Sequence, residues 1–251
     1  MRRFHCFSTS SLVPLGALAA MLLMGPLWAA APSQQQLQAL EAAYNGDGDL
    51  GRLLKSGPDL DAAEVERRRR QLQTQFPDAR WSLNPGPTLR DGRRTVWLRV
   101  RGTRQDGPLR FRLQAEQQLS LESDGRVITG QRVIREQSLL RSGTAALPVT
   151  LQIPDAVLTG QRYDVDVVFD EPLDGAIMAG GILELSPRQV SAFDNPAVKI
   201  GALGGGGLFR NVQAPFTPGT QTWAVLLLHP DGLVSVSKRV RVVSDKSELD
   251  L

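Results

Sequence analysis

The sequence predicts an α+β protein in which helices pack on a curved antiparallel sheet and an all-β sandwich follows. Three observations lead to this fold class. Apolar residues recur three to four apart between Ser33 and Phe76, which is typical of helices. They alternate with polar residues between Arg80 and Leu140, which is typical of strands with one buried face. Short alternating stretches separated by Gly, Pro and Asp turns fill residues 147–243, as in a sandwich.

Residues 1–31 have the order of a cleavable signal peptide. Arg2 and Arg3 form a positive start, residues 12–27 are uncharged and apolar, and residues 29–31 are three alanines that suit a signal peptidase. We therefore expect export to the periplasm or another extracytoplasmic compartment, with cleavage in or just after the alanines.

An uncleaved membrane anchor is the alternative. The chain carries no charged side chain between Arg3 and Glu41, and its apolar run approaches the roughly 20 residues that span a bilayer. Prolines and glycines weaken such a helix; they are Pro14, Gly16, Gly25 and Pro26. Cleavage is therefore favoured, and no membrane span is expected afterwards.

The charge of the cleaved chain is nearly balanced. The full sequence has 29 Lys and Arg against 26 Asp and Glu, and removal of residues 1–31 leaves 27 basic residues against the same 26 acidic ones. Such a chain exerts no long-range attraction on nucleic acid, so no nucleic-acid partner is expected. Cys6 also lies in the removed segment, so the core must form without disulfides.

The helical part divides at a turn. Residues 45–49, Asn-Gly-Asp-Gly-Asp, interrupt the apolar pattern, and Pro77 ends it. Asp61 is placed to cap the later helix, with Glu64 at the reciprocal position of a capping box. We expect two helical stretches between Ser33 and Phe76.

The strands that follow are expected at 80–83, 95–101 and 110–122, and a tight turn at 123–125 leads to an antiparallel partner over 127–140. In the 110–122 stretch one face is apolar and the other polar. The apolar face holds Phe111, Leu113, Ala115, Leu119 and Leu121. Gln117 is the one polar residue on that face.

The expected units are residues 33–141 and 147–243, joined by a linker of small residues at 142–146, with a flexible tail at 244–251. No convincing amphipathic helix is visible after residue 146. The strands expected in the second unit are 149–153, 163–169, 181–185, 222–228 and 233–243, and Pro230-Asp231-Gly232 joins the last two as a hairpin.

Short motifs in the first unit resemble the nuclear transport factor two-like superfamily, and its polyketide-cyclase-like branch in particular. They are residues 76–81 (Phe-Pro-Asp-Ala-Arg-Trp) after the helices, 101–104 (Arg-Gly-Thr-Arg) closing a strand, and 124–127 (Asp-Gly-Arg-Val) at a turn. The resemblance covers residues 36–140. It implies a cone with a pocket between the helices and the sheet, and members of the superfamily include enzymes, small-molecule binders and docking proteins.

No catalytic residue is assigned. Enzymatic branches of that superfamily use an acid or an Asp–His pair in the cone, whereas this chain has no histidine between Pro32 and His229. The second unit is similar to an immunoglobulin-like sandwich in strand spacing alone, because it lacks a Cys-Trp-Cys framework.

No metal or cofactor is predicted. His229 lies before Pro230 and suits a turn, and without cysteine a Cys/His zinc site is excluded. Five acidic residues cluster after residue 163, but without the glycine-punctuated spacing of a calcium loop; they are Asp164, Asp166, Asp170, Glu171 and Asp174. Residues 67–70, four arginines, favour a solvated helix face paired with Glu64 and Glu66.

Two features remain as candidate binding sites. Gln117 would orient a ligand in the pocket of the cone, or it would simply be satisfied by neighbouring main chain in a dry core. A glycine run flanked by apolar residues would form a partner loop; its members are Gly204, Gly205, Gly206, Gly207 and Phe209.

The sequence therefore favours a non-catalytic exported protein that binds an unidentified small molecule or protein partner. The alternative is a carboxylate-dependent enzyme of the nuclear transport factor two-like superfamily, which requires a buried acid with a shifted pKa. A third reading, a structural subunit, requires a large apolar surface patch.

Overall fold

The computed structural model describes residues 30–143, 147–170, 178–192, 197–203 and 206–249. The signal segment expected at 1–31 lies almost entirely outside these residues, as do residues 144–146 of the expected linker. No helix in the described part of the chain is long and apolar enough to cross a membrane.

The two expected helices form as α1 (Gln34–Tyr44) and α3 (Ala62–Gln75), and a four-residue helix that the periodicity does not predict, α2 (Leu50–Leu53), lies between them. Ser33 and Gln36 make a capping box at the start of α1. Asp61 caps α3 by accepting from the backbone N–H groups of Ala63 and Glu64. The Glu64 carboxylate is bonded to Arg67 and Arg68.

Four long strands follow as an antiparallel meander: β1 (Arg80–Pro85), β2 (Val96–Asp106), β3 (Leu109–Ser123) and β4 (Ile128–Ser142). The turn at 123–125 is confirmed, because Asp124 Oδ1 accepts from the N–H groups of Arg126 and Val127. The pairing of β3 with β4 shifts after Gln118, where Ile134 is an extra residue on β4.

The second half is strand-rich, as expected. Its strands are β5 (Val149–Gln152), β6 (Ala156–Leu158), β7 (Arg162–Asp164), β8 (Asp166–Phe169), β9 (Met178–Leu185), β10 (Gly201–Leu203), β11 (Gly207–Leu208), β12 (Asn211–Gln213), β13 (Gly219–His229) and β14 (Gly232–Val243). The strand expected at 163–169 is two strands, since β7 pairs with β12 while β8 pairs with β5 and β11.

Two short helical elements were not expected from the sequence. The six-residue helix α4 (Pro187–Ala192) follows β9 and is too short to show a helical period. A 3-10 turn, η1 (Lys246–Glu248), lies in the segment expected as a flexible tail. Asp245 caps this turn, and Glu248 Oε2 lies 3.2 Å from Arg132 Nη2. Residues 250–251 are outside the described chain.

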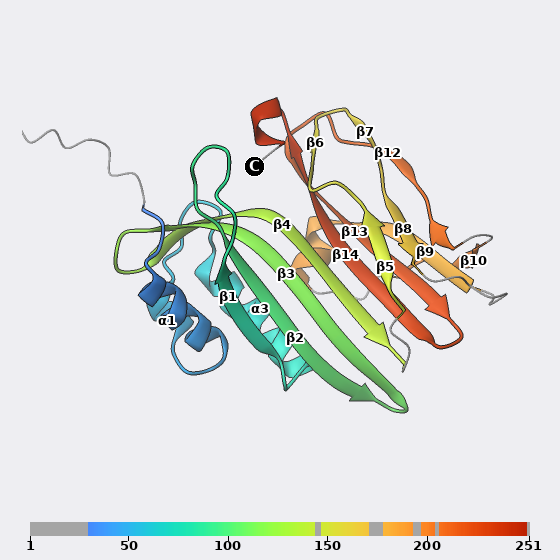
Figure 1. The fold of residues 1–251 in the computed structure, drawn as a ribbon, viewed down its shortest axis with the longest axis horizontal. Coiled ribbons are helices and arrows are strands. Elements are labelled where there is room, and N and C mark those ends of the chain that lie inside the picture. Colours follow the sequence, from blue (N-terminus) through green and yellow to red (C-terminus); the bar gives the residue numbers. More distant parts are fainter. Residues whose placement is uncertain (1–29, 144–146, 171–177, 193–196, 204–205, 250–251) are drawn as a thin grey trace, which may run out of the picture.

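One antiparallel sheet runs through both halves of the molecule (Figure 1). Its described strands follow the order β1-β2-β3-β4-β14-β13-β9-β10, with β6 pairing parallel to β14. The joint is the β4–β14 pair, from Gln137 opposite Lys238 to Arg141 opposite Val234. The two expected units therefore share a sheet, and whether they fold separately stays a prediction.

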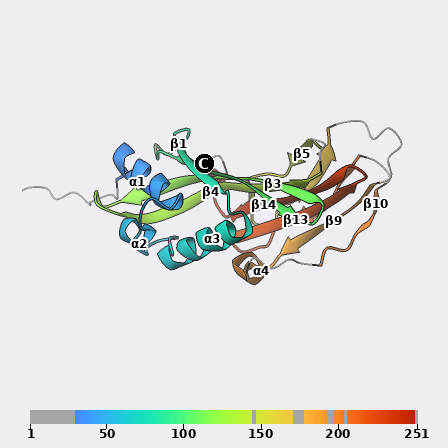
Figure 2. The ribbon, with the colours of Figure 1, turned by 90° about the horizontal axis from the view of Figure 1, so that it is seen from below.

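The two hydrophobic cores lie on opposite faces of this sheet. Side chains of register partners share a face, so Leu113, Leu140 and Ser235 point one way and Gln114, Leu139 and Val236 the other. The first face packs on the core that includes α1 and α2, and the second on the sandwich core of the C-terminal half. Figure 2 shows α2, α3 and α4 on one side of the sheet and β5 on the other.

Candidate functional site

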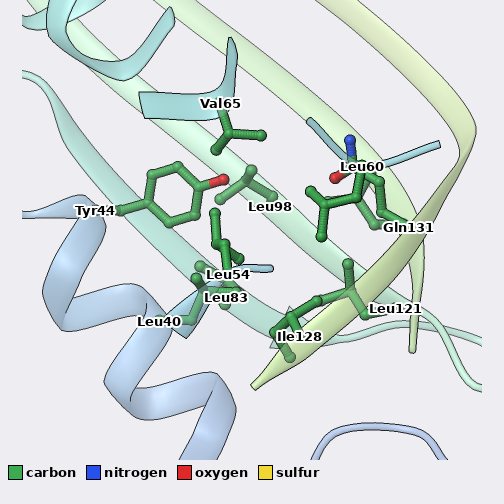
Figure 3. A pocket seen from close by; sticks show the side chains of 11 residues that line it. Leu40, Tyr44, Leu54, Leu60, Val65, Leu83, Leu98, Leu121, Ile128 and Gln131 are labelled. Atoms are coloured by element: carbon green, nitrogen blue, oxygen red, sulfur yellow. The ribbon is translucent and has the colours of Figure 1, made fainter. Parts of the chain in front are cut away.

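Side chains fill the space between the helices and the sheet. A cavity of about 10 Å³ is left there, which is room for one water molecule at most. Figure 3 shows its lining: Leu40, Tyr44, Leu54, Leu60, Val65, Leu83, Leu98, Leu119, Leu121, Ile128 and Gln131. Burial, followed by the charge of Glu66, raises the pKa of Tyr44, so its phenol stays protonated. A ligand of metabolite size does not fit this cavity.

Gln117 lies on the helix-covered face of β3, as the alternation predicts, but it is not among the residues that line the cavity. Its Nε2 donates to Glu136 Oε1 at 2.8 Å, so the hydrogen-bond partner of this amide is a side-chain carboxylate. The fully buried amide is Gln118, only 5% exposed, which donates to Thr95 Oγ1. A ligand-binding role for Gln117 stays a prediction.

The glycine run has two described members. Gly204 and Gly205 lie outside the described residues. The Gly206 carbonyl accepts from Phe169 N–H at 2.7 Å, and Gly207 belongs to strand β11 and not to a loop. A Cβ atom on Gly207 would lie 2.5 Å from the Val167 carbonyl oxygen, so the close pairing with β8 requires glycine there. Phe209 is 67% exposed, and its role in partner binding stays a prediction.

The described polar clusters have local structural partners. His229 Nδ1 accepts from Asp231 N–H at 3.1 Å, within the hairpin turn. Asp164 accepts from the Asn211 amide and Asp166 from the Arg210 backbone, while Glu171 and Asp174 lie outside the described residues. In the described residues no group of three or more His, Cys, Asp or Glu could hold a metal ion.

The four arginines of α3 pair with its two glutamates, as predicted. Glu64 lies 2.5 Å from Arg67 and 2.6 Å from Arg68, and Glu66 lies 3.0 Å from Arg69 and 3.5 Å from Arg70. Arg67 Nη2 also donates to the Ser191 carbonyl at 2.6 Å, which ties α3 to α4.

A groove of larger volume than this cavity lies on the other face of the sheet. It has a volume of about 440 Å³ and lies between β2–β4 and strand β5. Its floor includes Arg99, Arg101, Gln114, Glu116, Gln137 and Leu139, and residues 149–151 form its wall. β5 is an outer strand of its three-stranded sheet, and its residues 149–151 line the groove. The groove therefore forms where the open sheet face meets the sandwich.

The floor of the groove is basic. Alternation and register place eight arginines on this face of β1–β4, of which Arg99 and Arg101 line the groove: Arg80, Arg99, Arg101, Arg110, Arg112, Arg132, Arg135 and Arg141. The carboxylate that lines the groove is Glu116. Its Oε2 lies 3.3 Å from Arg99 Nε and its Oε1 accepts from Gln137 at 2.9 Å, so both oxygens are engaged. Positive charge therefore exceeds negative charge on the floor.

Arg101 and Arg141 stand out on this face. Arg101 is exposed and makes no ion pair with any described residue. Arg141 is bonded to neutral acceptors, Gln114 Oε1 at 3.4 Å and the Leu147 carbonyl at 3.3 Å. Burial, then the charge of Arg112, lowers the pKa of Arg141, and Asp170 opposes this shift. Both cations can therefore gain from an anionic ligand.

An ion-pair cluster lies on the same face of the sheet as the groove. Asp155 pairs with Lys238 Nζ and lies 2.6 Å from Arg135 Nε. Lys238 is 4% exposed and shares its face with the sandwich core residues Val236 and Val240. Both carboxylate oxygens of Asp155 are thereby engaged in ion pairs.

The sequence shows the polar face of 110–122 but not the groove. The alternation of β2 and β3 predicts which residues leave the helix-covered core. What it does not reveal is the β4–β14 pairing, which brings β5 beside that face. These contacts join residues far apart in the chain, and no local pattern records them.

Comparison with known proteins bears on the second half alone. No curated protein matches the chain. A protein-family model does match part of the chain, from residue 144, within the expected linker, to the end of β14. Over residues 144–243 the chain is similar to a family described as a domain of unknown function (DUF8623).

Proposed function

We propose that this protein is a non-catalytic, exported binding protein whose binding site is the groove between β2–β4 and β5. The observation that carries the proposal is the contrast between the two hollows: about 440 Å³ in the groove against about 10 Å³ inside the cone. The groove also supplies Arg101 for an anionic group, and Arg141 lies on the same face of the sheet. A partner segment is thus favoured over a small molecule in the cone.

The proposal includes export and the expected domain types. The charge, apolar run and three alanines of residues 1–31 support a cleaved signal peptide. Three helices over an antiparallel meander support a cone of the nuclear transport factor two-like superfamily, and the packed sheets of residues 147–243 support an immunoglobulin-like sandwich. The intact mass of the protein from its native compartment tests the cleavage.

Charge reversal in the groove tests the binding site. Chemical cross-linking in native cells, followed by mass spectrometry, would compare the wild type with Arg101→Glu. The matched control is Arg126→Glu, an exposed arginine in the β3–β4 turn. We expect Arg101→Glu to lose a specific cross-linked partner that Arg126→Glu keeps.

A third variant tests the cone. If Gln117→Leu abolishes binding while Arg101→Glu leaves it intact, the site is the cone and the groove proposal is wrong. Thermal unfolding of each variant checks that a lost partner does not reflect a lost fold.

A further inference from the structure

Resting on the groove as the binding site, we infer that its ligand is an extended acidic peptide segment that adds as a strand to the free edge of β5. Three observations on the described residues carry this inference. They are the unpaired edge of β5, the basic floor beside it and the alternation of side chains along β5.

The first observation is the edge. β5 is an outer strand of the three-stranded sheet β11-β8-β5, and among the described residues it pairs with β8 alone. Its other side therefore presents backbone N–H and C=O groups without a strand partner. An added strand satisfies such groups, and main-chain bonds of this kind provide affinity in strand-addition complexes.

The edge of β5 carries neither a charged side chain nor a bulge. Native edge strands are often guarded by charged side chains or bulges. The sequence of β5 is Val-Thr-Leu-Gln, without a charge, and its register with β8 is unbroken. Pro148 and Pro154 flank the segment, so the accessible edge is short. An added segment would bond only a few residues, which suits a short linear motif.

The second observation is the charge of the floor. Arg99 and Arg101 line the groove, and Arg141 lies on the same face of the sheet, where its guanidinium donates to two neutral acceptors, Gln114 Oε1 and the Leu147 carbonyl. Glu116 is already held by Arg99 and Gln137. An incoming carboxylate thus meets cations without displacing an existing ion pair at Arg101. Charge complementarity selects an acidic segment over a basic one.

The third observation is the alternation along the wall. Val149 and Leu151 pack against the sandwich core, whereas Thr150 and Gln152 are exposed. A strand laid beside β5 would continue this alternation, with every second side chain directed at the floor. Acidic residues at alternate positions would therefore reach the arginines, and the positions between them would face away.

The direct test uses a fluorescein-labelled octapeptide of alternating Glu and Val and the purified protein, with binding measured by fluorescence anisotropy. We expect saturable binding that weakens as salt rises, and a peptide of alternating Lys and Val should not bind. Arg101→Glu should weaken binding about tenfold, while Arg126→Glu should leave it within about twofold. Equal binding by wild type and Arg101→Glu would overturn the inference.

Backbone methylation separates strand addition from simple charge attraction. Two further peptides carry N-methyl groups on the Glu residues or on the Val residues, so each lacks the N–H groups of one edge. At least one should lose binding about tenfold or more, because an added strand donates from one edge. If both bind like the parent, strand addition is wrong, while the groove stands as an anionic site.

Hydrogen exchange locates the bound ligand, and a competitor tests its chemical class. Amides in 149–152 should exchange more slowly with the Glu-Val peptide bound. If a heparin decasaccharide binds more tightly than the Glu-Val peptide and this binding depends on Arg101, the ligand is not a peptide. The groove would then remain the proposed binding site. If the peptide protects helix amides in 34–75 and leaves 149–152 unchanged, both the inference and the groove proposal are wrong.

Discussion

Leu139 and Leu140 are neighbours in β4, yet they pack into different hydrophobic cores. Leu139 contacts the sandwich core and Leu140 the core beneath α1 and α2. This follows from the period of two in a strand, which sends consecutive side chains to opposite faces. The two cores therefore pack against opposite faces of the same sheet.

Alanine at either position should therefore weaken a different part of the molecule. Both leucines are half-buried, so each substitution should cost about 1–2 kcal/mol. Leu139→Ala should speed hydrogen exchange in β8 and β13, and Leu140→Ala in α1 and β1. The same exchange pattern in both variants would contradict two separate cores.

Tyr163 links two buried polar groups in the sandwich core. Its hydroxyl accepts from Trp223 Nε1 and donates to Gln221 Oε1, both at 2.9 Å, and Gln221 Nε2 donates to Glu184. Burial raises the pKa of Tyr163, which keeps this hydroxyl a donor. Tyr163→Phe should lower the free energy of unfolding by about 1–3 kcal/mol, because it leaves Trp223 and Gln221 without this partner.

Urea denaturation followed by Trp fluorescence measures this loss. Tyr44→Phe is the matched control, since Tyr44 packs against the other core and stacks on Trp81. Equal stability of Tyr163→Phe and the wild type would show that the chain of hydrogen bonds contributes nothing net.

Local patterns predicted most elements of the first half, whereas the arrangement of the whole depended on distant pairs. The alternation of residues 110–122 and the cap at Asp61 are properties of short segments. The pairing of Ser138 with Ser237, whose hydroxyls lie 2.7 Å apart, is recorded by no local signal. The groove depends on that pairing, so the sequence could not locate it.

Gln117 shows a second limit of prediction from the sequence. The alternation placed it on the correct face, but the ligand pocket expected around it depended on how tightly the helices pack. Large side chains such as Tyr44 and Leu98 fill that space. The space left between helices and a sheet depends on the side chains of both, so the sequence of one strand does not reveal it.

Asp78 should make stability depend on pH. The side-chain hydrogen bond from Thr103 Oγ1, followed by the bond from Thr103 N–H, lowers the pKa of Asp78 below its usual 3.8. A lowered folded-state pKa stabilises the fold above the unfolded value, and this stabilisation disappears as pH falls through the folded one. Asp78→Asn should therefore lower Tm at pH 7, and the difference from wild type should shrink below pH 3.8.

Thermal scans between pH 7 and the acid range measure this effect. Asp47→Asn, at an exposed site in the α1–α2 turn, is the control and should leave Tm unchanged. A difference between Asp78→Asn and wild type that stays constant with pH would contradict the assignment.

Arg241 is a buried cation with incomplete bonding. It is 6% exposed; its Nε donates to the Ile134 carbonyl, and both Nη atoms lack a hydrogen-bond partner in the described chain. Burying such groups is costly, and an apolar side chain of similar length avoids that cost. Arg241→Met should raise the free energy of unfolding by about 1 kcal/mol.

Chemical denaturation of Arg241→Met and of Arg52→Met tests this expectation. Arg52 is the control because its side chain is 87% exposed. A destabilised Arg241→Met variant would mean that the attraction of Glu248 and Asp155 outweighs the cost of burial.

The central position of β14 in the sheet determines when the sheet can finish assembling during synthesis. The four-strand meander β1–β4 needs only neighbouring segments, whereas β14 is the last of the described strands in sequence and lies between β4 and β13 in the sheet. Synthesis from the N-terminus must therefore reach β14 before the sheet can close. Until then β4 carries an open edge, so loss of the final strand would leave a chain prone to aggregation.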